Sequence, residues 1–337
     1  MENLRIETIE MHTGGEPLRI VKSGLPMVPG ETVFDKMRYL KENLDSLRKL
    51  IIFEPRGHYD MFGVYLVDVE GADIGCIFIH NEGYSTMCGH AVVALGRYVI
   101  DHGIVREPVS PETRIVMQCP CGPVEAFVQY EHGKTGNVRF ISVPSFLFQK
   151  DVEVDVPGYG IVTVDISYGG AFYAFLPAER LGFDLSTTPT DQLRNAAGTV
   201  TEALKGVLKL THPENSDLAF LYGTMLTDGK DEYSDASHLC VFADKEVDRS
   251  PCGSGSTARI ALQFHRGLIK LGQKRTFRGP AGSKFVARVV KQVNVGSHDA
   301  VIVEVSGKGH YMGSSVFTLE ADDEIGKGYL LKQEITE

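Results

Sequence analysis

Apolar and polar residues alternate in short runs through much of the first half of the chain. Residues 5–12 and 18–21 have this period of two, which predicts two strands separated by a Gly-Gly-Glu-Pro break. Residues 61–69 and 73–80 follow as a second pair of predicted strands. Between the pairs, apolar residues recur at helical spacing across residues 32–50, and we predict one helix there.

A Cys-Gly step precedes each of two further predicted helices. Residues 91–102 predict a buried apolar helix that ends at Gly103, and residues 254–266 predict a second helix that ends at Gly267. Each cysteine lies 15 positions before its terminal glycine (103 − 88 and 267 − 252). The remaining pattern predicts a helix at 191–210 and strands at 113–118, 124–130, 137–142, 162–168, 218–226, 284–292, 300–305 and 314–320.

The pattern of the first half starts again in the second. A strand followed by Gly-Gly occurs at residues 14–15 and again at 169–170, each time ahead of a Cys-Gly helix. This correspondence predicts a duplicated chain with an N-terminal half, 1–158, and a C-terminal half, 159–337. We leave open whether the last strand packs back on the N-terminal half. The alternative is two unrelated α+β domains that share a Cys-Gly step by chance.

The composition excludes several classes of function. The 337 residues carry a formal net charge of −10 and no basic block, so we do not expect a nucleic-acid partner. The apolar runs are too short to cross a membrane, and without an export signal we expect a cytoplasmic protein. Its six cysteines are expected to be free thiols rather than a disulfide framework.

Cys88 and Cys252 each lie at the start of a predicted helix, where a thiolate is easiest to form. Such positions lower a thiol pKa from about 8.5 into the range ~3.5–7.5. If strands wrap each helix, both helix starts face one ligand cleft between the halves. A thiolate and a thiol there can remove a proton from a carbon atom and return one to its other face. The alternative is a pair of buried structural cysteines.

The same helix starts offer unpaired backbone N–H groups that suit a carboxylate. Gly89 and Gly253 would let the carboxylate approach the backbone closely, and donors aimed at it would stabilise the developing carbanion. His90 is a candidate donor to the carboxylate or a modulator of the Cys88 thiol. Asp248 is a candidate partner for a cationic nitrogen. The alternatives are that His90 is only a structural residue at the helix start and that Asp248 only forms a turn.

Other motifs carry less information. The two thiols in 119–121 lack a second matching pair and indicate zinc only weakly. The polar clusters 12–16 and 54–58 either line the cleft or make turns, and we favour turns. The Phe-rich stretches 146–148 and 172–175 are predicted to belong to the core rather than to contact a ligand. No phosphate-binding motif implies a nucleotide.

Four segments resemble, in order, the signature segments of the proline racemase family. They are residues 12–16 (His-Thr-Gly-Gly-Glu), 54–58 (Glu-Pro-Arg-Gly-His), 87–90 (Met-Cys-Gly-His) and 248–255 (Asp-Arg-Ser-Pro-Cys-Gly-Ser-Gly). The resemblance covers nearly the whole chain. It implies a mixed α/β (α+β) fold like that of diaminopimelate epimerase, with two pseudo-symmetric halves, each a barrel-like sheet around a central helix. It implies no pyridoxal phosphate, metal or other cofactor.

The resemblance also implies roles for particular residues. Cys88 and Cys252 would be the paired acid/base residues, and Asp248 would bind the ring nitrogen of the substrate. The residues implied to bind the substrate carboxylate are Gly89, His90, Gly253 and Ser254.

The family contains proline racemases, 4-hydroxyproline 2-epimerases and trans-3-hydroxy-L-proline dehydratases. Segments 80–87 and 91–98 look most like the dehydratase branch, which usually has threonine where this chain has Cys252. Dehydration needs one base, whereas racemisation needs a proton donor on the far face of the substrate, which a thiol supplies better than a hydroxyl. We therefore predict a cofactor-independent racemase or epimerase of proline or hydroxyproline.

Two alternatives stay open. The first is a trans-3-hydroxy-L-proline dehydratase that forms Δ1-pyrroline-2-carboxylate. The second, more remote, is a non-catalytic thiol sensor or a binding module for small acids. In each case the expected partner is a small molecule, and a homodimer is left open.

Overall fold

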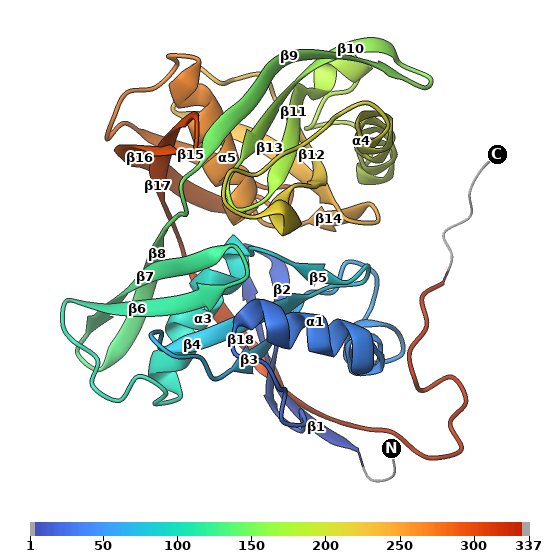
Figure 1. Ribbon diagram of the computed structural model, residues 1–337, viewed down its shortest axis with the longest axis vertical. Helices are drawn as coiled ribbons and strands as arrows, with labels where there is room; N and C mark the ends of the chain where they lie inside the picture. The colour runs from blue at the N-terminus through green and yellow to red at the C-terminus, as the bar shows by residue number, and fades with distance from the viewer. Residues whose placement is uncertain (1–3, 332–337) are drawn as a thin grey trace.

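The computed structural model describes residues 4–331, which form two lobes stacked along the long axis (Figure 1). Each lobe wraps strands around one buried helix. The helix of the first lobe is α3 (Gly89–Asp101) and that of the second is α5 (Gly253–His265). All residues of α3 except Arg97 and Asp101 are buried, and most of them are apolar, so this helix is stable only when it is enclosed.

The first lobe contains strands from both ends of the described chain. Strand β18 pairs with β1 along its whole length, so the chain returns to this lobe after completing the second. Its helices besides α3 are α1 (Val33–Asn43) and α2 (Asp45–Ile52). Its strands are β1 (Arg5–Thr13), β2 (Glu16–Ser23), β3 (Gly63–Val67), β4 (Ile74–Ile79), β5 (Tyr84–Ser85), β6 (Glu112–Cys119), β7 (Gly122–Glu131), β8 (Lys134–Ile141) and β18 (Gly309–Thr318).

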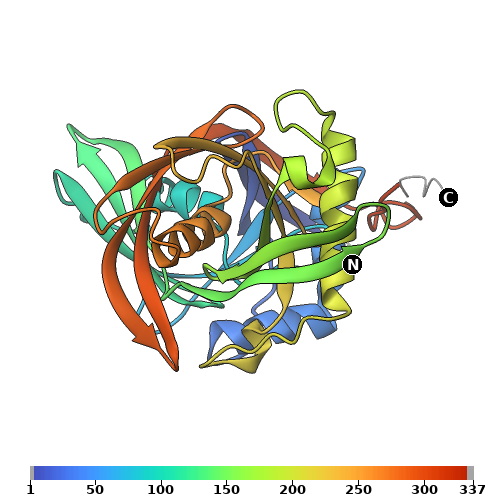
Figure 2. The same cartoon turned by 90° about the horizontal axis from the view of Figure 1, so that it is seen from above.

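In the second lobe, α5 lies between the long hairpins β9–β10 and β16–β17 (Figure 2). Helix α4 (Thr190–Lys205) packs on the outer side of the sheet, against β12. Short 3₁₀ helices span Ala178–Leu181 and Ser216–Leu218. The strands are β9 (Phe146–Val156), β10 (Gly160–Tyr168), β11 (Phe172–Pro177), β12 (Leu221–Thr227), β13 (Asp235–Phe242), β14 (Glu246–Asp248), β15 (Lys274–Arg278), β16 (Lys284–Val295) and β17 (His298–Gly307).

Backbone pairing joins the lobes. Strand β17 pairs antiparallel with β16 in its own lobe and with β8 of the first lobe, which carries one sheet across the junction. Strand β9 follows β8 in the chain but pairs with β10 of the second lobe. The division between halves at 158/159 stays a prediction.

Most predicted elements are confirmed, and the helix predicted over 32–50 is the clearest difference. It is two helices, because the backbone leaves helical geometry at Leu44, where φ is −133° and ψ is 18°. Thr32 and Asp35 form a capping box at the start of the first. Within residues 4–331, no helix has the length and apolar character needed to span a membrane.

Candidate functional site

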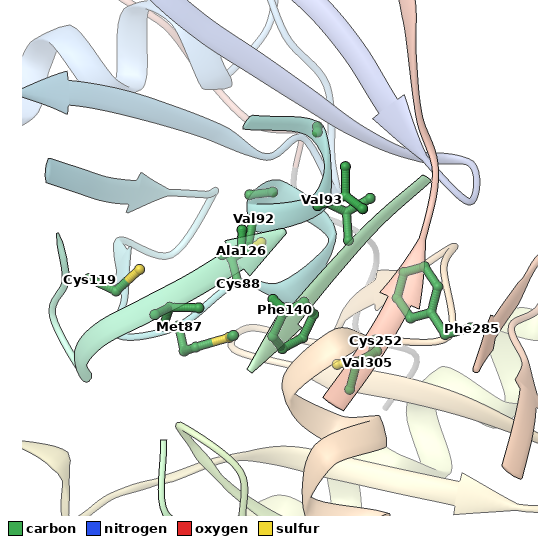
Figure 3. Packing of buried hydrophobic residues seen from close by; sticks show 14 of the residues in the cluster. Met87, Cys88, Val92, Val93, Cys119, Ala126, Phe140, Cys252, Phe285 and Val305 are labelled. Atoms are coloured by element: carbon green, nitrogen blue, oxygen red, sulfur yellow. The ribbon is translucent and has the colours of Figure 1, made fainter. Parts of the chain in front are cut away.

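The starts of α3 and α5 meet where the two lobes touch. A Cβ atom placed on Gly89 would lie 2.4 Å from the Cα of Gly253, and the reverse substitution meets the same obstacle. Glycine at both positions is therefore what lets the two helix N-termini come together. Figure 3 shows Cys88 and Cys252 at these two helix starts.

All seven residues predicted for the site line one small cavity. It has a volume of about 20 Å³, which is room for roughly one water molecule. The predicted residues around it are Cys88, Gly89, His90, Asp248, Cys252, Gly253 and Ser254, and the others are Phe62, Met87, Tyr173, Tyr222 and Phe242.

Cys88 has a histidine as its nearest polar neighbour. Its Sγ lies 3.1 Å from Nδ1 of His90, whose Nε2 lies 3.2 Å from the carbonyl oxygen of Pro17. A carbonyl can only accept, so Nε2 carries the ring proton and Nδ1 presents a lone pair to the thiol. Burial lowers the pKa of His90 to about 3 and raises that of Cys88, so a neutral thiol donates to a neutral imidazole in this closed state. The prediction that the helix start lowers the thiol pKa is therefore wrong for Cys88, because burial outweighs the backbone N–H groups at the helix start.

Cys252 has hydroxyl neighbours and an unusual backbone. Its Sγ lies 3.8 Å from the hydroxyl of Tyr173 and 4.0 Å from that of Ser254, and these two hydroxyls are 2.7 Å apart. Its φ of +57° is in the left-handed region. That conformation costs a residue other than glycine about 1–3 kcal/mol, so the surrounding structure must hold it.

Both helix starts present free backbone donors to the cavity. Within the described chain no side chain caps either helix, and Cys88 and Cys252 occupy the cap positions themselves. The first helical hydrogen bonds run from Val92 N to the Cys88 oxygen and from Ser256 N to the Cys252 oxygen. The N–H groups before them, together with two helix dipoles, suit a carboxylate.

Two buried carboxyl groups lie on the Cys252 side of the cavity. Asp248 ends β14, is 4% exposed, and accepts a hydrogen bond of 2.7 Å from Ser250 N. Burial raises its pKa to about 6. Glu16, from the first lobe, accepts a 2.6 Å bond from Arg249 N, and burial with the nearby Asp248 raises its pKa as well.

Several residues of the weaker sequence motifs have structural roles. Gly14 and Gly15 make the tight turn between β1 and β2 at positive φ. Arg56 donates to the carbonyl oxygens of Thr318 and Gly326 and so ties down the C-terminal segment. Cys119 is buried beside Cys76. Among residues 4–331 no three His, Cys, Asp or Glu side chains are grouped so that they could hold a metal ion.

The aromatic lining was missed at the sequence level. Phe172–Pro177 is strand β11, and its side chains alternate between two cores: Phe172 and Ala174 face one, whereas Tyr173 and Phe175 face the other. The prediction that this stretch belongs to the core holds for its phenylalanines, but Tyr173 also lines the cavity. A hydroxyl in a fully buried strand was the available signal, because a buried Tyr usually has a polar partner.

Comparison with known proteins gives the relationships of the chain. The family model described as "Proline racemase" matches residues 8–330. A trans-L-3-hydroxyproline dehydratase from Saccoglossus kowalevskii is 58% identical over 96% of this chain and 100% of its own. A 3-hydroxyproline 2-epimerase from Burkholderia multivorans is 42% identical over 97% of this chain and 98% of its own.

A solved structure agrees with these matches. The hydroxyproline epimerase from Agrobacterium vitis, with bound trans-4-hydroxy-L-proline, superposes with a TM-score of 0.91 at 26% identity, covering 98% of this chain and 96% of that one. This confirms the diaminopimelate epimerase-like α/β fold expected from the resemblance. The chain therefore belongs to the proline racemase family.

Proposed function

We propose that the protein removes water from trans-3-hydroxy-L-proline and forms Δ1-pyrroline-2-carboxylate. The presence of Cys252 favoured a racemase or epimerase over a dehydratase, and the comparisons reverse this ranking. The relative with 58% identity is named as a dehydratase, and the epimerase is more distant, at 42% identity. The observation that carries the proposal is the single cavity that both cysteines and both helix starts line. After the lobes separate to admit it, one small carboxylic acid would lie there with a thiol on each side.

The substrate would be held by its two charged groups. Its carboxylate would accept from the backbone N–H groups at Gly89, His90, Gly253 and Ser254, where negative charge builds up as the α-proton leaves. Its ring ammonium would pair with Asp248. The closed cavity of about 20 Å³ is too small for the ring, so the lobes must separate to admit it.

Substrate stereochemistry lets one base carry out both proton transfers, and we assign this role to Cys88. In trans-3-hydroxy-L-proline the 3-hydroxyl and the carboxylate lie on opposite faces, so the α-hydrogen and the hydroxyl share one face. Once ionised, the Cys88 thiolate takes the α-proton as the carbanion forms, and Nδ1 of His90, 3.1 Å from its sulfur in the closed state, orients the side chain. The resulting thiol returns that proton to the departing hydroxyl. Water leaves, and the enamine tautomerises to the cyclic imine.

Epimerisation at the α-carbon is the second candidate, and Cys252 favours it. A thiol on the opposite wall can protonate the carbanion from the far face before the hydroxyl leaves. The same thiol would serve proline or 4-hydroxyproline, which carry no 3-hydroxyl to expel.

One assay decides between the two candidates. The protein is incubated with trans-3-hydroxy-L-proline in D₂O, the imine is followed by its absorbance after trapping with o-aminobenzaldehyde, and the epimer is followed by NMR. We expect imine as the main product. We expect Cys252→Thr to change imine formation less than about threefold while it lowers any epimer formation on the order of 10²-fold.

Other outcomes would overturn the proposal. Epimer without imine from the unaltered protein would make the second candidate the function. Absence of both products from 3-hydroxyproline, 4-hydroxyproline and proline would contradict both candidates. L-Proline serves as the matched substrate, because it can be epimerised but not dehydrated.

A further inference from the structure

The left-handed backbone of Cys252 is held by hydrogen bonds to the peptide just before it. The carbonyl oxygen of Pro251 accepts from the hydroxyl of Ser256 at 2.8 Å and from Nε2 of His238 at 2.5 Å. The N–H of Cys252 donates to Ser250 Oγ at 3.1 Å. The Pro251–Cys252 peptide is thus fixed at both its oxygen and its nitrogen.

The direction of the His238 bond is set by a buried arginine. Nη1 of Arg259, on α5, lies 3.1 Å from Nδ1 of His238, and a guanidinium can only donate. Nδ1 is therefore the acceptor, and Nε2 carries the proton that the Pro251 oxygen receives. Arg259 is itself oriented by Asp231 at 2.8 Å and by the carbonyl of Ser237 at 3.0 Å.

The histidine and the arginine of this series are closed to solvent, and only Asp231 at its outer end is partly exposed, at 27%. His238 is 2% exposed and Arg259 is 0% exposed, and the ring of Phe277 stacks on the imidazole with centroids 5.2 Å apart. Burial and the nearby Arg259 lower the pKa of His238 to about 3, so it stays neutral at physiological pH. A neutral histidine with one defined tautomer is a fixed donor rather than an acid or base.

We infer that His238 is a positioning residue for Cys252: through the Pro251 carbonyl, the series Asp231–Arg259–His238 holds the second thiol in its left-handed conformation, facing the cavity. Cys88 has an extended backbone, with φ of −142°, and needs no such support. The inference rests on the proposed acid/base role of the two thiols. It makes the position of the Cys252 thiol, but not that of the Cys88 thiol, depend on His238.

The test compares the two thiols within one protein. Iodoacetamide is added to the full chain, and mass spectrometry follows the alkylation rates at Cys252 and at Cys88. We expect His238→Leu to lower the ratio of the Cys252 rate to the Cys88 rate about tenfold. We expect His238→Gln to keep this ratio within about threefold of the starting value. The glutamine amide can still donate to Pro251 and accept from Arg259, so it reproduces both contacts.

Two further variants guard against a general loss of structure. His265→Leu alters the other end of α5 and should leave the ratio unchanged. Ser256→Ala removes the second donor to the Pro251 oxygen and should lower the ratio even if His238→Leu does not fold. A ratio unchanged in Ser256→Ala or in folded His238→Leu, or lowered equally by His238→Gln, would overturn the inference.

The readout separates this inference from the proposed function. Alkylation needs no substrate, so the ratio is decisive even if the protein turns over no hydroxyproline. Where it does, His238→Leu should lower epimer formation more than imine formation, because only epimer formation needs Cys252.

Discussion

The two helix starts have the same architecture and different chemistry. Each is a Cys-Gly step at the mouth of a buried helix, and the two glycines touch. At the first, Cys88 has an extended backbone and a proton acceptor, His90, at 3.1 Å. At the second, Cys252 has a left-handed backbone and hydroxyl neighbours.

The difference shows how a nearly symmetric framework can support an asymmetric reaction. The Cys88 sulfur is hydrogen-bonded to His90, which fixes its direction and fits the base that we propose. Hydrogen bonds to its backbone hold Cys252 in place, which fits the proton donor that we propose for the far face of the substrate. In the proposed reactions, both helix starts bind the carboxylate, but dehydration needs only the thiol of the first, whereas epimerisation needs both thiols.

Removing the first thiol should have the largest effect. We expect Cys88→Ser to lower dehydration and any epimerisation about 10²–10⁴-fold, because both begin with removal of the α-proton and a hydroxyl is a poor base. Steady-state kinetics with trans-3-hydroxy-L-proline measures this. Cys121→Ser alters a thiol outside the cavity and should stay near the starting activity. A Cys88→Ser protein with substantial imine formation would move the base to another residue.

Forcing the helix starts apart should have the next largest effect. A methyl group on Gly89 would lie 2.4 Å from the Cα of Gly253, so Gly89→Ala must displace one helix against the other. We expect a loss of about 1–3 kcal/mol in the free energy of unfolding. A shift of about 1 Å between Cys88 and the carboxylate-binding N–H groups of the second helix start should cost on the order of 10²-fold in kcat.

The matched control is Gly83→Ala, since a Cβ there meets no atom within 4 Å. Denaturant unfolding and kcat should both stay near their starting values in this variant. If Gly89→Ala behaved the same way, the close approach of the two helix starts would not matter for activity.

Much of this site could be read from the sequence because its key positions are local. Cys88-Gly89 and Cys252-Gly253 each stand directly before a run of helical spacing, which marks them as helix starts, whereas Cys121-Gly122 stands before the alternating pattern of strand β7. The sequence also marked Asp248, which is four residues from Cys252. All seven predicted residues line the cavity.

The remaining site residues depend on register and topology. Tyr173 reaches the cavity because β11 pairs with β12 in a buried sheet, and Phe62 because the turn before β3 brings it beside β13. His238 lies fourteen residues before Cys252, and only the pairing of β13 places it under Pro251. The break of the predicted helix at Leu44 likewise has no strong local signal, such as Gly or Pro.

The smallest effect concerns pH and the Cys252 side of the cavity. Asp248 has a pKa of about 6, and it must be ionised to hold a substrate ammonium. As the pH falls through 6 the carboxylate takes up a proton and loses its charge, so kcat/KM should fall in acid, by about tenfold at pH 5. His90, with a pKa of about 3, is neutral throughout this range and cannot produce the change.

Two variants sharpen this prediction. Asp248→Asn should lower kcat/KM near neutral pH and abolish the acidic fall, because the group that titrates is gone. Glu16→Gln tests the other buried carboxyl group on this side of the cavity. Burial and the nearby Asp248 raise the pKa of Glu16, so its charge does not set the pKa of Asp248, and the acidic fall should stay near pH 6 in this variant. An acidic fall that persists in Asp248→Asn, or one that is lost in Glu16→Gln, would assign it to a group other than Asp248.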